Sequence, residues 1–472
     1  MASKRMARIF RSATSVIGSL TLACAMAMAA GAKSVYAQNN SNAATSPAAS
    51  APASVTATSA APAAVTATGD ADSIPVGTTI STLNWSQYQR FMPDGMAALF
   101  AGTYFWKMPA AAQIEVGPTI IHPLPKNYMT ATEKYAAQVK VVALADGGLT
   151  LSGYQGGIPF PVPDEPHKGW KVLANLWYRY LPHLIVDTYA HGCLMTSGGT
   201  INCKTAEIIS RQLAFNTDPG TPATYPGAEG KFATEYFMVQ EPEQERYTAF
   251  LSIAYADPAR AEDTYLFLPQ LRRYQPISAT ARCSPNQGTD STQEDYRFGY
   301  NSNITEAQVQ FLGEKKILAL LGANLPVGEF PDNYTMPLGW PMPSWGKWQV
   351  RDVDVISVSK IPSRAAGYCY GKRVMYVDKA TWAPLWEDLY DRQMQPWRFF
   401  ALFLRTVDVP GVGPVDASGS MVWAFWDVQN NHASFFIDPG EGHQLYVNEQ
   451  APKEFTDLTR YASAPGLNLI MR

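Results

Sequence analysis

Residues 397–404 read WRFFALFL, and large apolar side chains occupy both sets of alternating positions. In an extended strand, one face would carry Trp397, Phe399, Ala401 and Phe403, and the other Phe400, Leu402 and Leu404 beside Arg398. An antiparallel sheet with one face in water alternates apolar with polar residues. This strand is therefore expected to be covered on both faces.

Strand-like runs of the same kind recur through the second half of the chain, separated by turn residues such as Asn430-Asn431. Their short connections suit antiparallel hairpins and meanders. The predicted strands are Phe232–Val239, Arg246–Tyr255, Tyr265–Leu268, Trp348–Ser359, Arg373–Val377, Pro384–Tyr390, Trp397–Leu404, Met421–Val428 and Ala433–Ile437.

Three helices are expected beside these strands. Thr130 and Glu133 form a capping box for a helix over residues 130–142. Apolar residues from Trp170 to Tyr180 mark one face of a second helix. A third helix is expected over Lys453–Arg460. The chain is thus predicted to be α+β and mainly antiparallel β.

Two explanations stay open for the two-faced strands, by which we mean strands such as 397–404 that are apolar on both faces. Helices or loops covering the second face would give a thick core. A curved sheet would instead line an apolar cavity on its concave side, because ligand pockets are walled mainly by aromatic and aliphatic side chains. A transmembrane barrel fits poorly because it requires polar lumen residues in alternation. Alternation alone does not identify the concave face.

Composition and the first 75 residues indicate an exported protein. The 472 residues are 46% hydrophobic and 16% charged with a net charge of −3, so a nucleic-acid partner is not expected. Residues 1–37 have the basic head, apolar run and small-residue end of a signal peptide; a membrane anchor and lipidation at Cys24 are the alternatives. Residues 38–75 form a flexible Ala/Ser/Thr/Pro linker, and residues 76–472 a single large domain.

Four cysteines remain after cleavage, and an even number in an exported protein favours disulfides. Cys193 and Cys203 flank a turn signal, so a hairpin would place them opposite each other. Cys283 and Cys369 are then paired by elimination. The cysteine spacing does not match a zinc site, and no cofactor is expected.

Other polar patterns have ordinary structural interpretations. His183, Asp187 and His191 are spaced like metal ligands, but a structural role is favoured and no metal is assigned. The acidic loop Gly288–Asp295 is interpreted as a turn with local capping rather than a cation site. Glu387, Asp388 and Asp391 are interpreted as solvated edge charges. The sequence contains none of the common catalytic motifs, so no catalytic residue is assigned.

Several short motifs together resemble a family of exported proteobacterial proteins of unknown function. They are Gly156–Pro163 with Trp170–Tyr180, Tyr265–Pro269 with Arg272-Arg273, Ala281–Cys283, Gly288–Asp290, and Tyr370–Asp378 with Tyr390–Arg392 and Trp397. That family is related to the LolA/LolB-like lipoprotein carriers. The resemblance implies a strongly curved sheet, an incomplete barrel, wrapped around a few helices with an apolar cavity between them.

The leading hypothesis is a non-catalytic carrier of a lipid or other hydrophobic ligand, in the periplasm or associated with the outer membrane. The resemblance adds a possible partner, an outer-membrane component or an export system of the resistance-nodulation-division (RND) type. Arg272 and Arg273 are candidates to meet an anionic head group at the cavity mouth. The expected cavity residues are Tyr247, Leu251, Ile253, Trp386, Trp397, Phe399, Trp423 and Phe425.

Two hypotheses from other classes are kept. The first is a structural or assembly factor that docks on an outer-membrane or transporter partner and fills its cavity with its own side chains. The second is a hydrolase with an unrecognised site. A buried carboxylate or histidine with a strongly shifted pKa in a cleft would favour that hydrolase.

Overall fold

The computed structural model describes residues 72–286, 288–324, 326–416, 421–438, 440 and 443–471. The predicted signal peptide, residues 1–37, and residues 38–71 of the predicted linker lie outside this range, so the proposed division of the chain stays a prediction. None of the helices in the described residues combines the length and apolar character needed to span a membrane.

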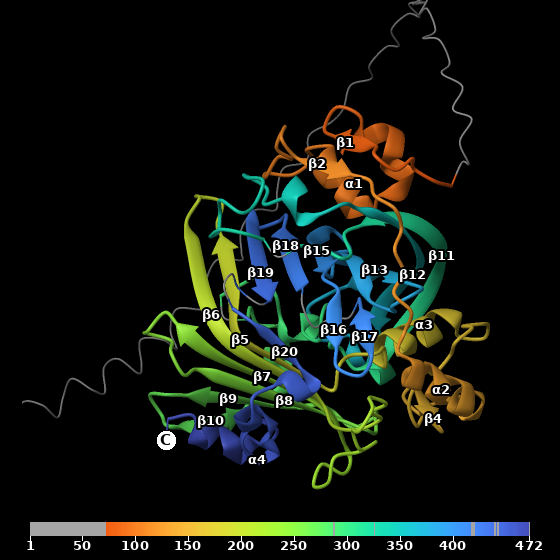
Figure 1. Cartoon of the computed structure of the whole chain (residues 1–472), viewed down its shortest axis with the longest axis vertical. Helices are drawn as coiled ribbons and strands as arrows, with labels where there is room; N and C mark the ends of the chain where they lie inside the picture. The colour runs from red at the N-terminus through yellow and green to blue at the C-terminus, as the bar shows by residue number, and fades with distance from the viewer. Residues whose placement is uncertain are drawn as a thin grey trace, which may run out of the picture. The chain divides into compact units, whose positions relative to one another are not determined.

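A 14-stranded sheet organises the fold, and every strand pair in it is antiparallel (Figure 1). Its order is β10-β9-β8-β7-β6-β5-β19-β18-β15-β14-β13-β12-β11, and β20 pairs with the beginning of β5. The end strands β10 and β11 do not pair with each other, so the strongly curved sheet is an incomplete barrel, as expected.

The strands of this sheet are β5 (Leu184–Met195), β6 (Ile201–Gln212), β7 (Lys231–Glu241), β8 (Ala249–Tyr255), β9 (Asp263–Leu268), β10 (Arg273–Pro276), β11 (Ala307–Ala319), β12 (Gln349–Lys360), β13 (Lys372–Asp378), β14 (Pro384–Tyr390), β15 (Pro396–Leu404), β18 (Met421–Asp427), β19 (His432–Asp438) and β20 (Leu445–Val447). Three two-stranded sheets flank it: β1 (Thr79–Ser81) with β2 (Gln113–Glu115), β3 (Lys140–Ala143) with β4 (Leu149–Ser152), and β16 (Val407–Val409) with β17 (Gly413–Val415).

The inner face of the large sheet is packed by helix α3 (Lys168–Trp177) and by residues 288–306. Gly169 lies so close to β11 that an added Cβ would stand 2.8 Å from the Phe311 nitrogen. The Trp170 indole donates a hydrogen bond of 3.0 Å to the Ile304 carbonyl. Helix α3 is therefore fixed against both the sheet and the inner segment.

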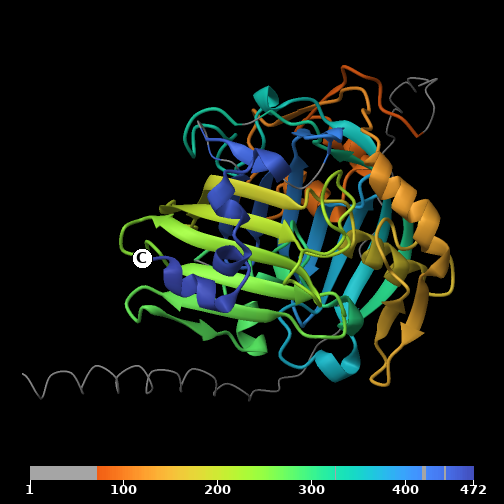
Figure 2. The ribbon, with the colours of Figure 1, turned by 60° about the horizontal axis from the view of Figure 1, so that its bottom comes forward.

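The outer face is covered by three other parts of the chain. Helix α1 (Asp94–Phe100) and residues 320–324 and 326–348 pack on the half formed by β14, β15, β18 and β19. The C-terminal segment with α4 (Leu458–Tyr461) lies across β7 to β9 (Figure 2). Both explanations of the two-faced strands therefore apply, since the outer side chains are covered and the inner ones surround an open space.

The predicted strands are confirmed to within about three residues at their ends. Strands β5, β6 and β11 had not been predicted as strands from the sequence, apart from the hairpin expected around Cys193 and Cys203. The helix predicted over residues 130–142 lies earlier in the chain. The observed helix, α2, spans Lys126–Tyr135 and begins directly after Pro125. The third predicted helix is a short 3-10 turn followed by α4.

Both predicted disulfides are present, Cys193–Cys203 across the β5–β6 hairpin and Cys283–Cys369. They close chain segments of very different length, with sequence separations of 10 and 86 residues. A disulfide stabilises the folded protein by reducing the conformational entropy of the unfolded chain. Loops of these lengths correspond to about 2 to 3 kcal/mol for the first disulfide and about 4 to 5 kcal/mol for the second.

Removal of the long-range disulfide is expected to destabilise the protein more than removal of the hairpin disulfide. The double variant C283S/C369S should lower the urea midpoint further than C193S/C203S, because it frees a much longer segment in the unfolded chain. Urea unfolding followed by tryptophan fluorescence measures both midpoints. Equal midpoints, or a larger loss for C193S/C203S, would contradict this expectation.

Candidate functional site

A cavity of about 560 Å³ lies between the inner face of the sheet and residues 286 and 288–299. Strands β5 to β8, β15, β18 and β19 contribute its wall. Most of the wall is aromatic or aliphatic, and it includes Leu194, Ile208, Phe250, Phe298, Phe400 and Phe436. Its size and composition fall in the range of small-molecule binding sites.

Strand β6 runs along the length of this cavity. Asn202, Lys204, Ala206, Ile208 and Ser210 alternate along β6 and all line the cavity. The strand rises about 3.3 Å per residue, so these side chains extend over ~26 Å. Asn202 is exposed and marks the mouth of the cavity. Ser210 is buried and marks its inner end.

The opposite wall is held in place by Arg373 of β13. Its buried guanidinium donates to the Asp295 carboxylate at 2.6 Å and to Glu387 of β14 at 3.1 Å, and it also donates to the backbone carbonyls of Glu294 and Gly299. Gly299 has φ +110°, and an added Cβ would stand 2.9 Å from the Phe400 ring. Only glycine fits this approach to the sheet.

A second arginine holds the same segment from its other side. Arg282 forms ion pairs with Glu294 and, at 3.0 Å, with Glu262, and it donates 2.7 Å to the Asn301 carbonyl. Neighbouring Cys283 is bonded to Cys369. Residues 288–301 are thus fixed by buried ion pairs and a nearby disulfide, so the cavity has a defined second wall.

The inner end of the cavity contains a buried carboxyl group, Glu235 of β7. Ser210 of β6, its partner across the strand pair, donates a hydrogen bond to it. Burial raises the pKa of Glu235 to about 7, although the Ser210 hydrogen bond and the charge of Arg297 act in the opposite direction. The residue keeps some accessible surface because its side chain faces the cavity.

Arg297 also lines the inner end and is 6% exposed. Its guanidinium carbon lies 4.4 Å from the Trp177 ring centre and 4.9 Å from that of Phe232. Burial lowers the pKa of Arg297, while Glu235 and Glu262 raise it. The arginine is thus held by aromatic faces rather than by an ion pair among the described residues.

The predicted cavity residues are divided between the two faces of the sheet. Trp423 lines the cavity, and Phe425 lies on the same face, 4.9 Å from the Phe400 ring. The register pairs Leu402 with Trp423, so Phe399 and Trp386 belong to the outer face. Trp386 stacks there on Trp426, 5.8 Å between ring centres.

The remaining predicted residues also require correction. Leu251 and Ile253 point outward and pack on the C-terminal segment, whereas their neighbour Phe250 lines the cavity. Tyr247 lies in the turn before β8, against Arg246. Trp397 is at the end of β15, where its indole donates 3.0 Å to Asp427.

Arg272 and Arg273 do not lie at the cavity mouth. Both are exposed, at the turn between β9 and the edge strand β10, and neither lines the cavity. The arginine that lines the cavity is Arg297. Arg297 is a single arginine within residues 296–300 (YRFGY), and nothing in that sequence indicates that it lines a cavity.

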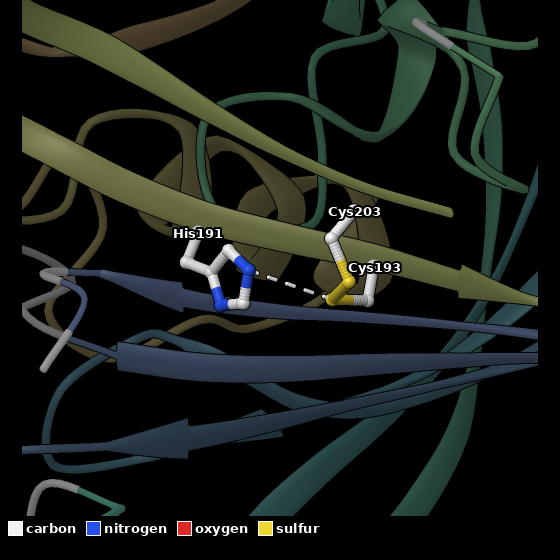
Figure 3. A group of neighbouring side chains, drawn as sticks. All are labelled: His191, Cys193 and Cys203. Atoms are coloured by element: carbon white, nitrogen blue, oxygen red, sulfur yellow. Dashed lines mark hydrogen bonds between the residues drawn. A yellow bond between two sulfur atoms is a disulfide. The ribbon is translucent and has the colours of Figure 1, made fainter. Parts of the chain in front are cut away.

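The histidine pattern considered as a metal site is not assembled. His183 contacts Asp218 at 2.9 Å, and Asp187 accepts a hydrogen bond from the Tyr189 backbone. His191 lies beside Cys193 and Cys203, with its Nε2 3.6 Å from the Cys193 sulfur (Figure 3). The two sulfurs are bonded to each other, so they are not available as thiolate ligands.

Two of the three acidic residues interpreted as solvated edge charges are buried instead. Glu387 and Asp388 are 0% and 1% exposed, and burial raises their pKa values to about 8 and about 7. Asp388 accepts hydrogen bonds from the Trp386 indole and the Gly95 backbone of α1. Their strand, β14, lies inside the sheet rather than at its edge. The residues next to them in the sequence do not indicate this position.

The acidic loop at 288–295 has the predicted local capping, because Thr292 and Asp295 form a capping box. Its burial was not predicted, and neither were the cavity residues of β5 and β6. Alternation within a predicted β5–β6 hairpin would have grouped Ala206, Ile208 and Ser210 on one face. The pairing of Ser210 with Glu235 has no local sequence signal.

The ionisation of Glu235 is expected to make stability depend on pH. Its pKa is about 7 in the folded chain against an ordinary value of 4.5, so the folded state binds more protons between these pH values. This contribution to stability is therefore lost as pH rises from about 4.5 to 7. The variant E235Q should melt above the wild type at pH 8, and the difference should shrink toward pH 5.

Differential scanning fluorimetry across this pH range measures the difference. The exposed Glu243, changed to Gln, is the matched control and should follow the wild type at every pH. A difference for E235Q that does not vary with pH would contradict the assignment.

Comparison with known proteins identifies the family. Residues 79–462 match the family described as "Protein of unknown function (DUF1329)". No curated protein matches the chain.

Solved structures of low sequence identity match parts of this chain. A putative outer membrane lipoprotein-sorting protein domain from Vibrio parahaemolyticus is 16% identical, with a TM-score of 0.43 over 65% of this chain and 99% of its own. A DUF1329 family protein from Desulfovibrio piger is 13% identical, with a TM-score of 0.43 over 63% and 99%. A LolA superfamily protein from Nitrosomonas europaea is 13% identical, with a TM-score of 0.35 over 61% and 97%. Because the family match spans most of the described residues, the chain belongs to the DUF1329 family, a family of unknown function.

Proposed function

We propose that this protein is a non-catalytic carrier or binder of a lipid or other hydrophobic ligand. The observation that carries the proposal is the cavity of about 560 Å³ with its largely apolar wall. The curved sheet supplies one wall and the ion-paired segment 288–301 supplies the other. A ligand with an apolar chain would replace water along a surface that water solvates poorly.

Desolvation is the expected source of affinity. Burying about 300 Å² of apolar ligand surface contributes on the order of 7 kcal/mol before the entropic costs of binding are subtracted. The net affinity would then be moderate, which suits a carrier that must also release its ligand.

The proposed location is the periplasm, where the protein would act at the outer membrane or beside an RND-type export system. Two disulfides, one of them linking residues 86 positions apart, support an oxidising compartment. The basic and apolar pattern of residues 1–37 supports export through a signal peptide. The transporter partner rests on the family resemblance alone.

The alternative function is a structural or assembly factor that docks on such a partner. That protein would need no open interior, because its own side chains would fill the space. The cavity therefore favours the carrier, and ligand uptake decides between the two.

The contact between Ser210 and Glu235 favours a hydrolase as a second candidate. A carboxyl group with a pKa of about 7 beside a serine hydroxyl is able to act as a base. Nitrophenyl esters of different chain length test this candidate. The carrier proposal expects no hydrolysis above the buffer rate, and hydrolysis that is lost in S210A would favour the hydrolase.

Filling the cavity is expected to weaken ligand uptake. Ile208 faces the cavity from the middle of β6, and its replacement by tryptophan would place an indole in the open space. Binding of a fluorescent fatty acid to I208W should weaken by about tenfold or more, which is at least 1.4 kcal/mol.

The matched control is the same change at Ile120, which is 51% exposed outside the sheet. I120W should bind the probe like the wild type, and circular dichroism should show both variants folded. Undiminished uptake by I208W would place the bound probe elsewhere, and no uptake by the wild type would overturn the carrier proposal.

A further inference from the structure

A buried arginine with no carboxylate partner among the described residues lies at the inner end of the cavity. Arg297 is 6% exposed, and its Nη1 is fully buried without a hydrogen-bond acceptor among the described residues. The rings of Trp177 and Phe232 hold the guanidinium, but they do not replace an anion. Buried arginines ordinarily pair with carboxylates or carbonyls, because an uncompensated buried charge costs free energy.

The backbone around Arg297 is held in an unusual conformation. Arg297 and Phe298 have φ values of +51° and +63°, in the left-handed region that such residues seldom adopt. The ion pair of Asp295 with Arg373 and the close contact of Gly299 with the sheet fix the two sides of this turn. The fold thus maintains a strained turn that keeps Arg297 at the cavity wall.

A second arginine and several carboxyl groups lie around this position. The buried Arg179 guanidinium donates 2.8 Å to the Arg297 carbonyl, so two arginines lie close together. The acidic neighbours are largely engaged elsewhere, Asp295 with Arg373 and both Glu262 and Glu294 with Arg282. Glu235 accepts from Ser210 and forms no ion pair with Arg297 among the described residues.

A second donor lies beside Arg297. The Tyr296 hydroxyl is buried without a hydrogen-bond partner among the described residues, and Tyr296 also lines the cavity. The inner end therefore offers a guanidinium and a phenol, and both are donors for an acceptor group.

We propose that the ligand is an amphiphile with an anionic head group, a carboxylate or phosphate ester, and that the head group binds Arg297 at the inner end of the cavity. This inference rests on the proposed carrier function. The apolar chain would then extend along Ile208, Phe250 and Phe436 toward the mouth. Lys204 and Glu245 at the mouth already pair with each other, so they leave the head group no competing anchor.

Displacement of a neutral hydrophobic dye, N-phenyl-1-naphthylamine, tests the inference with three ligands of one chain length. Lauric acid and dodecyl phosphate carry the two candidate head groups, and 1-dodecanol carries none. The wild type should bind the better anion at least about tenfold more tightly than dodecanol. The order of the two anions distinguishes a carboxylate from a phosphate ester.

The variants locate the head group. R297Q should reduce the preference for the anion to about twofold or less while leaving dodecanol affinity similar. R273Q is the matched control, because Arg273 is exposed away from the cavity, and it should retain the full preference. If R297Q does not fold, R297K keeps the charge, and the selectivity of the wild type still tests the inference.

The outcomes separate this inference from the function on which it rests. Binding of all three ligands with equal affinity would overturn the head-group assignment and leave the carrier in place. A preference retained in R297Q would place the anion elsewhere and also overturn it. Failure of every ligand to displace a bound dye, or of the dye to bind, would instead overturn the carrier proposal.

Discussion

The buried ion pairs of Arg373 fix the inner segment to the curved sheet. Arg373 connects β13 to Asp295 and to Glu387, so the inner segment is held at fixed points. Arg373 and Asp295 are fully buried, so replacing Arg373 would leave the Asp295 carboxylate without its ion-pair partner, which ordinarily costs about 3 to 5 kcal/mol.

The two-faced strands follow from the same arrangement. Along β15, the outer side chains are enclosed by α1 and residues 320–324 and 326–348, where Phe403 packs against Trp345 and Trp348. The inner side chain Phe400 contacts Gly299 on one side of the cavity and Phe425 on the sheet. One strand thus contributes to a closed core and to a cavity wall, so large apolar side chains occupy both of its faces.

Much of the fold could be predicted from local pattern. Strands such as 384–390 and 397–404 are dense in aromatic residues and leucine, and the turn between Cys193 and Cys203 indicated their disulfide. The concave face could not be predicted, because alternation shows that Phe399 and Phe400 point in opposite directions but not which one points inward. That choice is fixed by long-range pairing, which brings Trp423 beside Leu402. The selection of Phe399 and Leu251 therefore failed while their neighbours Phe400 and Phe250 line the cavity.

The candidate site was harder to predict for the same reason. Arg272 and Arg273 stand out in the sequence as an adjacent pair, yet they lie at an exposed turn. Arg297 is inconspicuous in the sequence and becomes important only when Trp177, Phe232 and Glu235 surround it. Glu387 and Asp388 similarly look like surface charges until β14 is placed in the middle of the sheet.

The most direct test of the account is native mass spectrometry of the full chain purified from its own host, followed by organic extraction and lipid analysis. The account predicts a stoichiometric amphiphile or other hydrophobic molecule bound to the protein and recovered in the extract. Protein that carries no such molecule, and that also fails to take up a fatty acid added in excess, would contradict the claim that the cavity is a binding site.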